Sequence, residues 1–306
     1  MTGTLSLSDL TKHFRKALSR DVEPDWSLAT KSAWGVLINE LANEVSFESL
    51  WKSATWVSSR FPDEKRSRLM LELCQQAAMY SSVKPFEPPQ GREIVIHHVP
   101  GSSKAILIFC GNANRFFMPL TIAHQWFGSL NATVVYLFDY TKSFYFRGLP
   151  SFRGGFKETI RDIKAELHLV GISEFYTCGS SSGGYAAIRA ATALPANGVL
   201  CFSAPTNLSA EFMIEHGVNL NCLPIALDDP DNALELRFEV LQSGHQPNMT
   251  LFFGAENTKD RLHSENLAGL PKVVLKPVAG VKGHNALVPS VFSGEWVMAL
   301  EQLVGN

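Results

Sequence analysis

The sequence predicts an α/β fold with a mostly parallel sheet flanked by helices, preceded by an N-terminal all-helical segment. Three observations predict it. Apolar residues recur at helical spacing over residues 1–82, and beyond a linker that contains proline and glycine, short apolar strands alternate with helical stretches. Inner strands such as residues 105–110 are continuous apolar runs, which is typical of strands buried on both faces of a parallel sheet.

The N-terminal segment, residues 1–82, has apolar residues at helical spacing and no convincing strand. We expect its helices at residues 6–18, 26–42, 47–59 and 63–80. Residues 47–80 resemble a single tetratricopeptide helix pair, and one such pair does not make a repeat array. We prefer the interpretation of a helical bundle packed against the main domain. A protein partner, or self-association through these helices, is the alternative.

The linker spans residues 83–92, and the predicted catalytic domain spans residues 93–306. Its expected strands are apolar and short, and they lie at residues 93–98, 105–110, 133–138, 175–178, 198–203, 250–254 and 272–277. The clearest helical stretches between and after them lie at residues 155–169, 183–193 and 288–303. A small lid-like insertion is expected at about residues 204–249, with helices near 209–216 and 232–242.

Composition excludes several classes of protein. Hydrophobic residues make up 45% of the chain and charged residues 18%, so a large buried core is expected. A net charge of −2 leaves no clustered basic surface for nucleic acid. No stretch approaches the roughly 18–20 apolar residues of a membrane span, and the N-terminus lacks a signal-peptide pattern. The odd count of five cysteines favours buried thiols in a reducing compartment, so we expect a cytoplasmic protein.

The most informative motif is the G-x-S-x-G pattern of Gly179, Ser181 and Gly183, because an apolar strand leads into it and a helix follows. A nucleophile in this pattern sits on a tight, strained strand-to-helix turn, which pushes its Oγ out above the sheet. Glycines two positions before and after it avoid a collision with neighbouring backbone. The helix N-terminus also directs N–H groups and partial positive charge toward the nucleophile. The motif therefore predicts a nucleophilic serine at position 181.

With this motif the chain resembles the α/β-hydrolase superfamily from about residue 93 onward, and it is expected to have that fold. In the superfamily a catalytic serine, acid and histidine follow one another in that order. The resemblance implies that His284, between the last expected strand and the final helix, is the triad histidine. The slot closest to strand 250–254 holds Asn257, which lacks the negative charge that stabilises an imidazolium. Asp260 is then the expected acid, Glu256 is the alternative, and a helix-capping role stays open for either carboxylate.

The resemblance also implies an oxyanion hole made by two backbone N–H groups. One belongs to the residue after the nucleophile, which is Ser182. The other comes from the loop after strand 105–110, where Cys110-Gly111 stands in place of the frequent His-Gly and Asn112 takes the donor position. A backbone donor tolerates the loss of that histidine, because the side chain does not make the hydrogen bond.

Motifs for other chemistries are absent from the sequence. It contains no H-E-x-x-H, no C-x-x-C pair, and no Walker-type or G-x-G-x-x-G loop after a strand. We therefore expect neither a cofactor nor a metal.

Together these residues predict a serine hydrolase that cleaves an ester-type bond in a small-molecule or acylated substrate through an acyl-serine intermediate. Apolar residues 116–118 and 144–146 are candidates for an acyl pocket, with core packing as the alternative interpretation. A thioesterase or an acyltransferase would use the same triad. The rival from another class is a catalytically idle hydrolase fold that serves in binding.

Overall fold

The computed structural model describes residues 5–80, 82, 84–217 and 234–305. The chain divides into two compact units, Met1–Gln90 with Pro119–Ser129, and Gly91–Met118 with Leu130–Asn306. The chain therefore leaves the second unit after residue 118 to add one helix to the first, and returns at residue 130.

The first unit is helical. Its elements are α1 (Leu7–Arg20), the short 3-10 helix η1 (Trp26–Leu28), α2 (Lys31–Leu41), α3 (Phe47–Arg60), α4 (Lys65–Ala77) and α5 (Leu120–Phe127). Helices α1 to α4 each begin after a residue whose side chain accepts a hydrogen bond from the N–H three positions later, which satisfies an N–H group that has no partner within the helix. These capping residues are Ser6, Thr30, Ser46 and Glu64. The stretch expected as one helix at residues 26–42 is η1 followed by α2.

The core of the first unit centres on Trp34, whose side chain is fully buried. The ring of Trp34 lies 5.7 Å from that of Phe14 and 5.2 Å from that of Trp26, measured between centroids. Helix α5 is buried along its whole length, and its Trp126 ring lies 6.0 Å from the ring of Tyr80, just after α4. Aromatic contacts thus join the first, second and fifth helices of this unit to the segments beside them.

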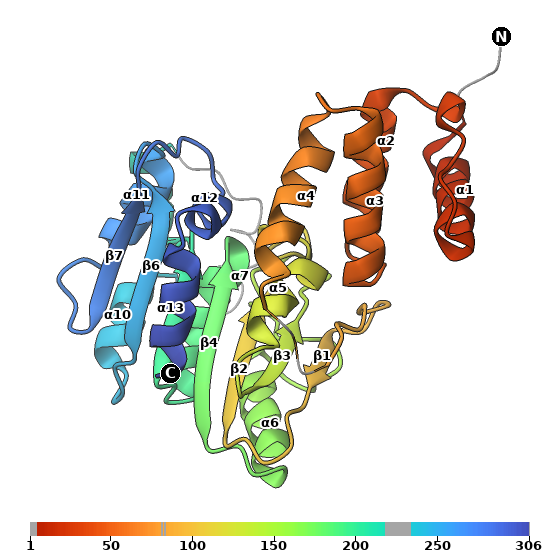
Figure 1. Cartoon of the computed structure of the whole chain (residues 1–306). Coiled ribbons are helices and arrows are strands. Elements are labelled where there is room, and N and C mark those ends of the chain that lie inside the picture. Colours follow the sequence, from red (N-terminus) through yellow and green to blue (C-terminus); the bar gives the residue numbers. More distant parts are fainter. Residues whose placement is uncertain (1–4, 81, 83, 218–233, 306) are drawn as a thin grey trace. The chain divides into compact units, whose positions relative to one another are not determined.

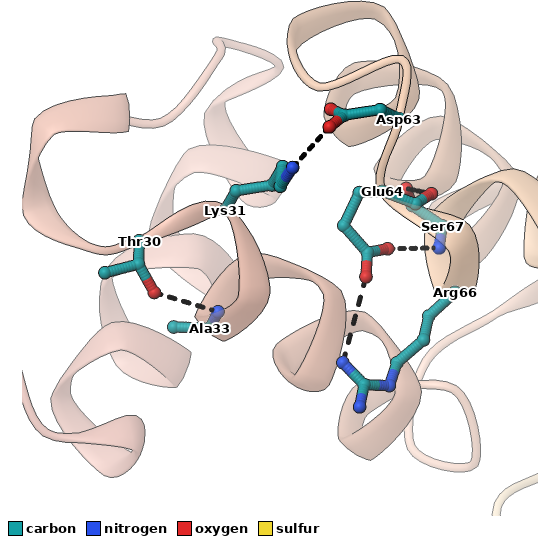
Figure 2. Close-up of polar contacts among 7 residues, drawn as sticks. All are labelled: Thr30, Lys31, Ala33, Asp63, Glu64, Arg66 and Ser67. Atoms are coloured by element: carbon teal, nitrogen blue, oxygen red, sulfur yellow. Dashed lines mark hydrogen bonds and ion pairs between the residues drawn. The ribbon is translucent and has the colours of Figure 1, made fainter.

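The start of α4 lies against α2, and Figure 2 shows the polar contacts there. The Glu64 carboxylate accepts a hydrogen bond from Ser67 N–H at 2.7 Å, while Lys31 forms an ion pair with Asp63. Glu64 is buried, and a Cβ added to Gly35 of α2 would lie 2.3 Å from its carboxyl carbon. Glycine at position 35 therefore makes room for the carboxylate that caps the neighbouring helix.

The second unit contains a seven-stranded sheet in the order β1-β3-β2-β4-β5-β6-β7, in which only β1 at the edge is antiparallel to its neighbour (Figure 1). The strands are β1 (Ile94–His97), β2 (Lys104–Phe109), β3 (Thr133–Leu137), β4 (Glu174–Ser180), β5 (Gly198–Phe202), β6 (Asn248–Gly254) and β7 (Val273–Val278). The predicted fold class, a mostly parallel sheet flanked by helices and preceded by an N-terminal helical segment, is confirmed.

Helices bury both faces of this sheet. One face packs into a core with α6 (Phe156–Leu169), α7 (Ser182–Ala193) and α10 (Leu236–Gln242). Strand residues such as Leu107 and Cys201 point into this core, and the residues that alternate with them point to the opposite face. There Trp296 of α13 (Glu295–Val304) lies 5.5 Å from Phe202, measured between ring centroids, and Figure 1 shows α13 in front of the sheet, running alongside the strands.

One expected segment contains the helices predicted for it, and another is divided in two. Helix α8 (Ala210–Glu215) and α10 lie within the expected lid-like insertion, and residues 218–233 of that insertion lie outside the described residues. The helix expected at residues 288–303 is divided into α12 (Leu287–Phe292) and α13, because Gly294 has a left-handed φ of 79° that ends the first and starts the second.

Within the described ranges, no helix is long and apolar enough to cross a membrane.

Candidate active site

Ser181 lies on the turn between β4 and α7, where the sequence places it. Its φ of 53° and ψ of −127° are strained for a non-glycine residue. Two backbone hydrogen bonds hold this conformation. Ser181 N–H donates to Phe202 C=O at 3.0 Å, and Gly184 N–H donates to Ser181 C=O at 2.8 Å. The end of β5 and the first turn of α7 therefore fix the serine from both sides.

The glycines of the motif allow three backbone segments to meet at this turn. A Cβ added to Gly183 would lie 2.0 Å from the carbonyl oxygen of Phe109 at the end of β2. A Cβ added to Gly179 would lie 2.2 Å from the carbonyl oxygen of Gly183. Real Cβ atoms do not approach backbone this closely, so the packing of α7 against β2 and β4 requires both glycines.

His284 and Asp260 lie beside Ser181 in a continuous hydrogen-bonded chain. The His284 Nε2 atom lies 2.9 Å from Ser181 Oγ, and its Nδ1 atom lies 2.8 Å from Asp260 Oδ1. The His284 side chain is 50% exposed, whereas that of Asp260 is 6% exposed. His284, the middle member of this hydrogen-bonded series, is thus half exposed, and the Asp260 end is buried. The structure brings together the three residues that the sequence proposed as a triad.

The position of Asp260 follows from the start of α11 (Thr258–Glu265). The Asn257 side chain caps this helix by accepting a hydrogen bond from Asp260 N–H at 3.1 Å. Asp260 therefore lies in the first helical turn, where its carboxylate is close to His284. The alternative acid, Glu256, is directed elsewhere, with its carboxylate 3.8 Å from Lys282 Nζ at the surface. Of the two carboxylates that the sequence left open, Asp260 is the one beside the histidine.

A second histidine, His263, lies near this acid and was missed in the sequence. It is one helical turn after Asp260 on α11 and is buried, with Thr206 N–H donating to its Nδ1 at 3.4 Å. Burial lowers the pKa of His263 to about 4, the imidazoles of His284 and His216 act in the same direction, and the Asp260 carboxylate opposes them. His263 is therefore neutral near pH 7. The i, i+3 spacing from the acid was the only signal that the sequence carried for it.

The loop after β2, residues 111–118, passes close to the nucleophile. A Cβ added to Gly111 would lie 3.0 Å from the Ser180 carbonyl oxygen and 3.4 Å from Ser181 Cβ, so glycine suits the close approach of the loop to the end of β4. The Ser182 hydroxyl donates a hydrogen bond to Asn112 Oδ1 at 2.8 Å. Among the described residues, neither Asn112 nor Ser182 donates its backbone N–H to another group. The two predicted oxyanion donors thus belong to residues that are in contact through their side chains.

Phe117 is the member of the two apolar triplets that contacts the histidine. Its ring lies edge-on to the His284 imidazole, 5.3 Å away between centroids. It has a φ of 56°, and Asn285 Nδ2 donates to its carbonyl oxygen at 3.2 Å. Phe144 and Phe146 instead pack against Tyr185 of α7 in the core beneath the sheet. Core packing thus accounts for that second triplet.

In the part of the chain that the structure describes, no group of three or more His, Cys, Asp or Glu side chains could hold a metal ion.

No protein-family model matches the chain, and no curated protein matches its sequence. Solved structures with a similar fold include an α/β hydrolase enzyme from the metagenome of lagoon sediments at Mar Chica, Morocco (16% identity, 69% of this chain and 92% of that one, TM-score 0.43). A structure from a study of carboxylesterases of the thaumarchaeon Nitrososphaera gargenis covers the same share of this chain and 94% of its own, at 11% identity and a TM-score of 0.46. A fluorophosphonate-binding serine hydrolase of Staphylococcus aureus, FphF, covers 69% of this chain and 86% of its own, at 14% identity and a TM-score of 0.42. By its own sheet order, and by the strand-to-helix turn between β4 and α7, this chain has the α/β-hydrolase fold.

Proposed function

We propose that this protein is a serine hydrolase that cleaves ester-type bonds with Ser181 as nucleophile, His284 as general base and acid, and Asp260 as the orienting carboxylate. The observation that carries the proposal is the hydrogen-bonded chain from Ser181 Oγ through both nitrogens of His284 to the buried Asp260 carboxylate. A nucleophile, a base and an orienting acid within hydrogen-bond reach of one another have the geometry of nucleophilic acyl transfer.

The reaction follows from these contacts in two halves. Ser181 Oγ attacks the ester carbonyl carbon while His284 Nε2 takes the hydroxyl proton. The C–O bond to the leaving alcohol then breaks, and His284 returns the proton to that alcohol, which leaves an acyl-serine. Water attacks the acyl-serine in the same way, which releases the carboxylic acid and restores Ser181. Asp260 accepts the Nδ1–H of His284 throughout and stabilises the imidazolium that forms in each half.

The negative charge that develops on the carbonyl oxygen needs donors on the other side of the substrate. The N–H groups of Asn112 and Ser182 are the proposed donors, and each is worth roughly 3–4 kcal/mol of transition-state stabilisation. The Ser182 N–H also lies at the first turn of α7, where the helix dipole favours negative charge. The proposed acyl-enzyme mechanism therefore has a nucleophile, a proton carrier and two oxyanion donors.

The test is intact mass after treatment with a fluorophosphonate probe. The wild type is expected to gain one adduct, and Ser181→Ala none. Ser180→Ala is a matched control, because it removes the neighbouring hydroxyl at the end of β4 and leaves Ser181 in place, and it is expected to keep the adduct. Near-UV circular dichroism checks that each variant is folded. A folded wild type without an adduct would contradict the proposal and would favour a protein that uses the hydrolase fold for binding.

A further inference from the structure

Asn112 and Ser182 are joined by a side-chain hydrogen bond that has no role in the triad. These two residues come from separate elements, the loop after β2 and the start of α7, and they are also the two proposed oxyanion donors. Their side chains are joined by the hydrogen bond from Ser182 Oγ to Asn112 Oδ1 at 2.8 Å. One side-chain bond therefore links the two backbone groups that must reach the same substrate oxygen.

We propose that this side-chain bond is a clasp that holds the loop of residues 111–118 in register with Ser181, so that Asn112 and Ser182 act as positioning residues for each other's N–H group. The proposal rests on the proposed function, since it assigns the clasp to the oxyanion hole of that reaction.

Ser182 is suited to be the fixed half of the clasp. Its side chain is buried, and the residues on either side of it are held by the strained turn and by the close approach of Gly183 to β2. A hydroxyl at the start of a helix often caps the helix itself, but the described hydroxyl contact of Ser182 is with Asn112. The first turn of α7 therefore offers a rigid donor to the loop.

Asn112 is suited to be the movable half. It is exposed at the start of its loop. Hydrogen bonds also form within the loop. Gly111 N–H donates to Arg115 C=O at 3.0 Å, and Asn114 N–H donates to Gly111 C=O at 2.8 Å. They set the loop's shape and do not attach Asn112 to α7.

Other hydrogen bonds attach the second half of the loop to its surroundings. Ser180 Oγ donates to Arg115 C=O at 3.4 Å, and Asn285 Nδ2 donates to Phe117 C=O at 3.2 Å. In the described residues, the bond from Ser182 is the side-chain hydrogen bond that holds Asn112 itself. Without it, the first half of the loop keeps its internal turn but loses its attachment beside the nucleophile.

Loss of the hydrogen bond between Asn112 and Ser182 is expected to weaken stabilisation of the transition state. Oxyanion donors act at about 2.7–3.1 Å from the developing oxyanion, and a displacement of about 1 Å is enough to lower the rate severely. Ground-state binding of the ester depends little on these groups, because the full negative charge is not yet present. Loss of the clasp is therefore expected to lower kcat and leave KM nearly unchanged.

The test is a double-mutant cycle with Ser182→Ala, Asn112→Ala and the two combined. These substitutions remove the side-chain bond and keep both backbone N–H groups. Steady-state kinetics on p-nitrophenyl acetate and the inhibition constant of a trifluoromethyl ketone, which forms a tetrahedral adduct, are measured for each. Ser203→Ala is the matched control, because its hydroxyl is equally buried and has no hydrogen-bond partner among the described residues.

Each single substitution is expected to lower kcat at least roughly tenfold and to weaken the trifluoromethyl ketone in parallel, with KM within about twofold of the wild type. The double variant is expected to be no worse than the worse single variant, because the two side chains act through one bond. An unchanged kcat in the single variants would overturn the clasp, and so would a loss of kcat in the double variant equal to the product of the two single losses. In either case, fluorophosphonate labelling of the wild type would still support the proposed function. A wild type that is not labelled would overturn both.

Discussion

At the scale of single residues, the acid beside His284 is determined by how α11 begins. Asn257 caps the helix, so the carboxylate that reaches the histidine is the one three positions later. One oxygen of Asp260 is bonded to His284, and Oδ2 has no hydrogen-bond partner among the described groups. A buried carboxylate with so few donors stabilises a positive charge on its one partner strongly. This environment suits the imidazolium that the proposed reaction forms.

The substitution Asp260→Asn is therefore expected to leave the fold intact and to lower kcat by about 10⁴-fold, because an amide favours the wrong tautomer of the histidine. Glu256→Gln is the matched control, since it neutralises a carboxylate on the same segment that pairs with Lys282 at the surface. It is expected to retain full activity. Ester hydrolysis rates for both variants check this, and a larger loss for Glu256→Gln than for Asp260→Asn would exclude Asp260 as the acid.

His263 predicts a pH dependence of stability. The unfolded chain takes up a proton at this histidine below about pH 6.5, whereas the folded protein does so only near pH 4. The free energy of unfolding is therefore expected to fall as the pH drops through this window, by about 3 kcal/mol from this group, and to be unaffected by it above pH 7. Urea unfolding at pH 7.5, 6.0 and 5.0 measures it for wild type and His263→Gln. The gap in stability between them should narrow as the pH falls, and a constant gap would contradict the assignment.

The positions of these candidate site residues could be predicted from the sequence to different degrees, for physical reasons. Ser181 and His284 were predictable because a strained turn demands glycines at fixed positions and because the histidine follows the last strand. The choice between Asp260 and Glu256 was not, because both carboxylates lie within a few residues and only the helix start at Asn257 separates their directions. His263 was missed because the sequence does not distinguish a buried, neutral histidine from one at the surface.

At the scale of elements, the spacing of apolar residues predicted those helices that bury one face and expose the other. It did not predict a helix that is buried on all faces. Helices α1 and α3 have polar outer faces, so their spacing was visible, and they begin within one residue of the predicted positions. Helix α5 was not singled out, because every residue in it is buried, its polar residues Thr121, His124 and Gln125 included, so its spacing does not separate a buried face from an exposed one. The division of the last helix depends on the left-handed conformation of Gly294, which spacing alone does not reveal.

The contact between α2 and α4 predicts the effect of a substitution at Gly35. Gly35→Ala is expected to lower the melting temperature, although alanine favours a helix by about 1 kcal/mol, because the new Cβ would meet the buried Glu64 carboxylate. Adding Glu64→Ser should restore or exceed wild-type stability, since serine still caps α4 and leaves room for the methyl group. Thermal unfolding of the single and double variants checks this. A single variant as stable as the wild type would show that α2 and α4 are not in close contact.

At the scale of the whole molecule, the two compact units are not consecutive in the sequence. The predicted boundaries, with a linker at residues 83–92, divide the chain once, whereas α5 returns to the N-terminal helices from between β2 and β3. Helix α5 is tied to these helices at several points. Its Trp126 packs against Tyr80, the Leu120 N–H donates to Asn43 at 3.4 Å, and the His124 ring lies 5.6 Å from that of Phe86.

A fragment of residues 93–306 would therefore carry α5 without the helices that cover one side of it. We expect this fragment to self-associate in size-exclusion chromatography and to unfold at a lower temperature than the full chain, because it exposes an apolar helix face. Within the fragment, Trp126→Lys should reduce the association, since this ring faces the missing Tyr80. A monomeric fragment that unfolds at the same temperature as the full chain would show that the predicted catalytic domain begins at the predicted boundary, with α5 as part of its own core.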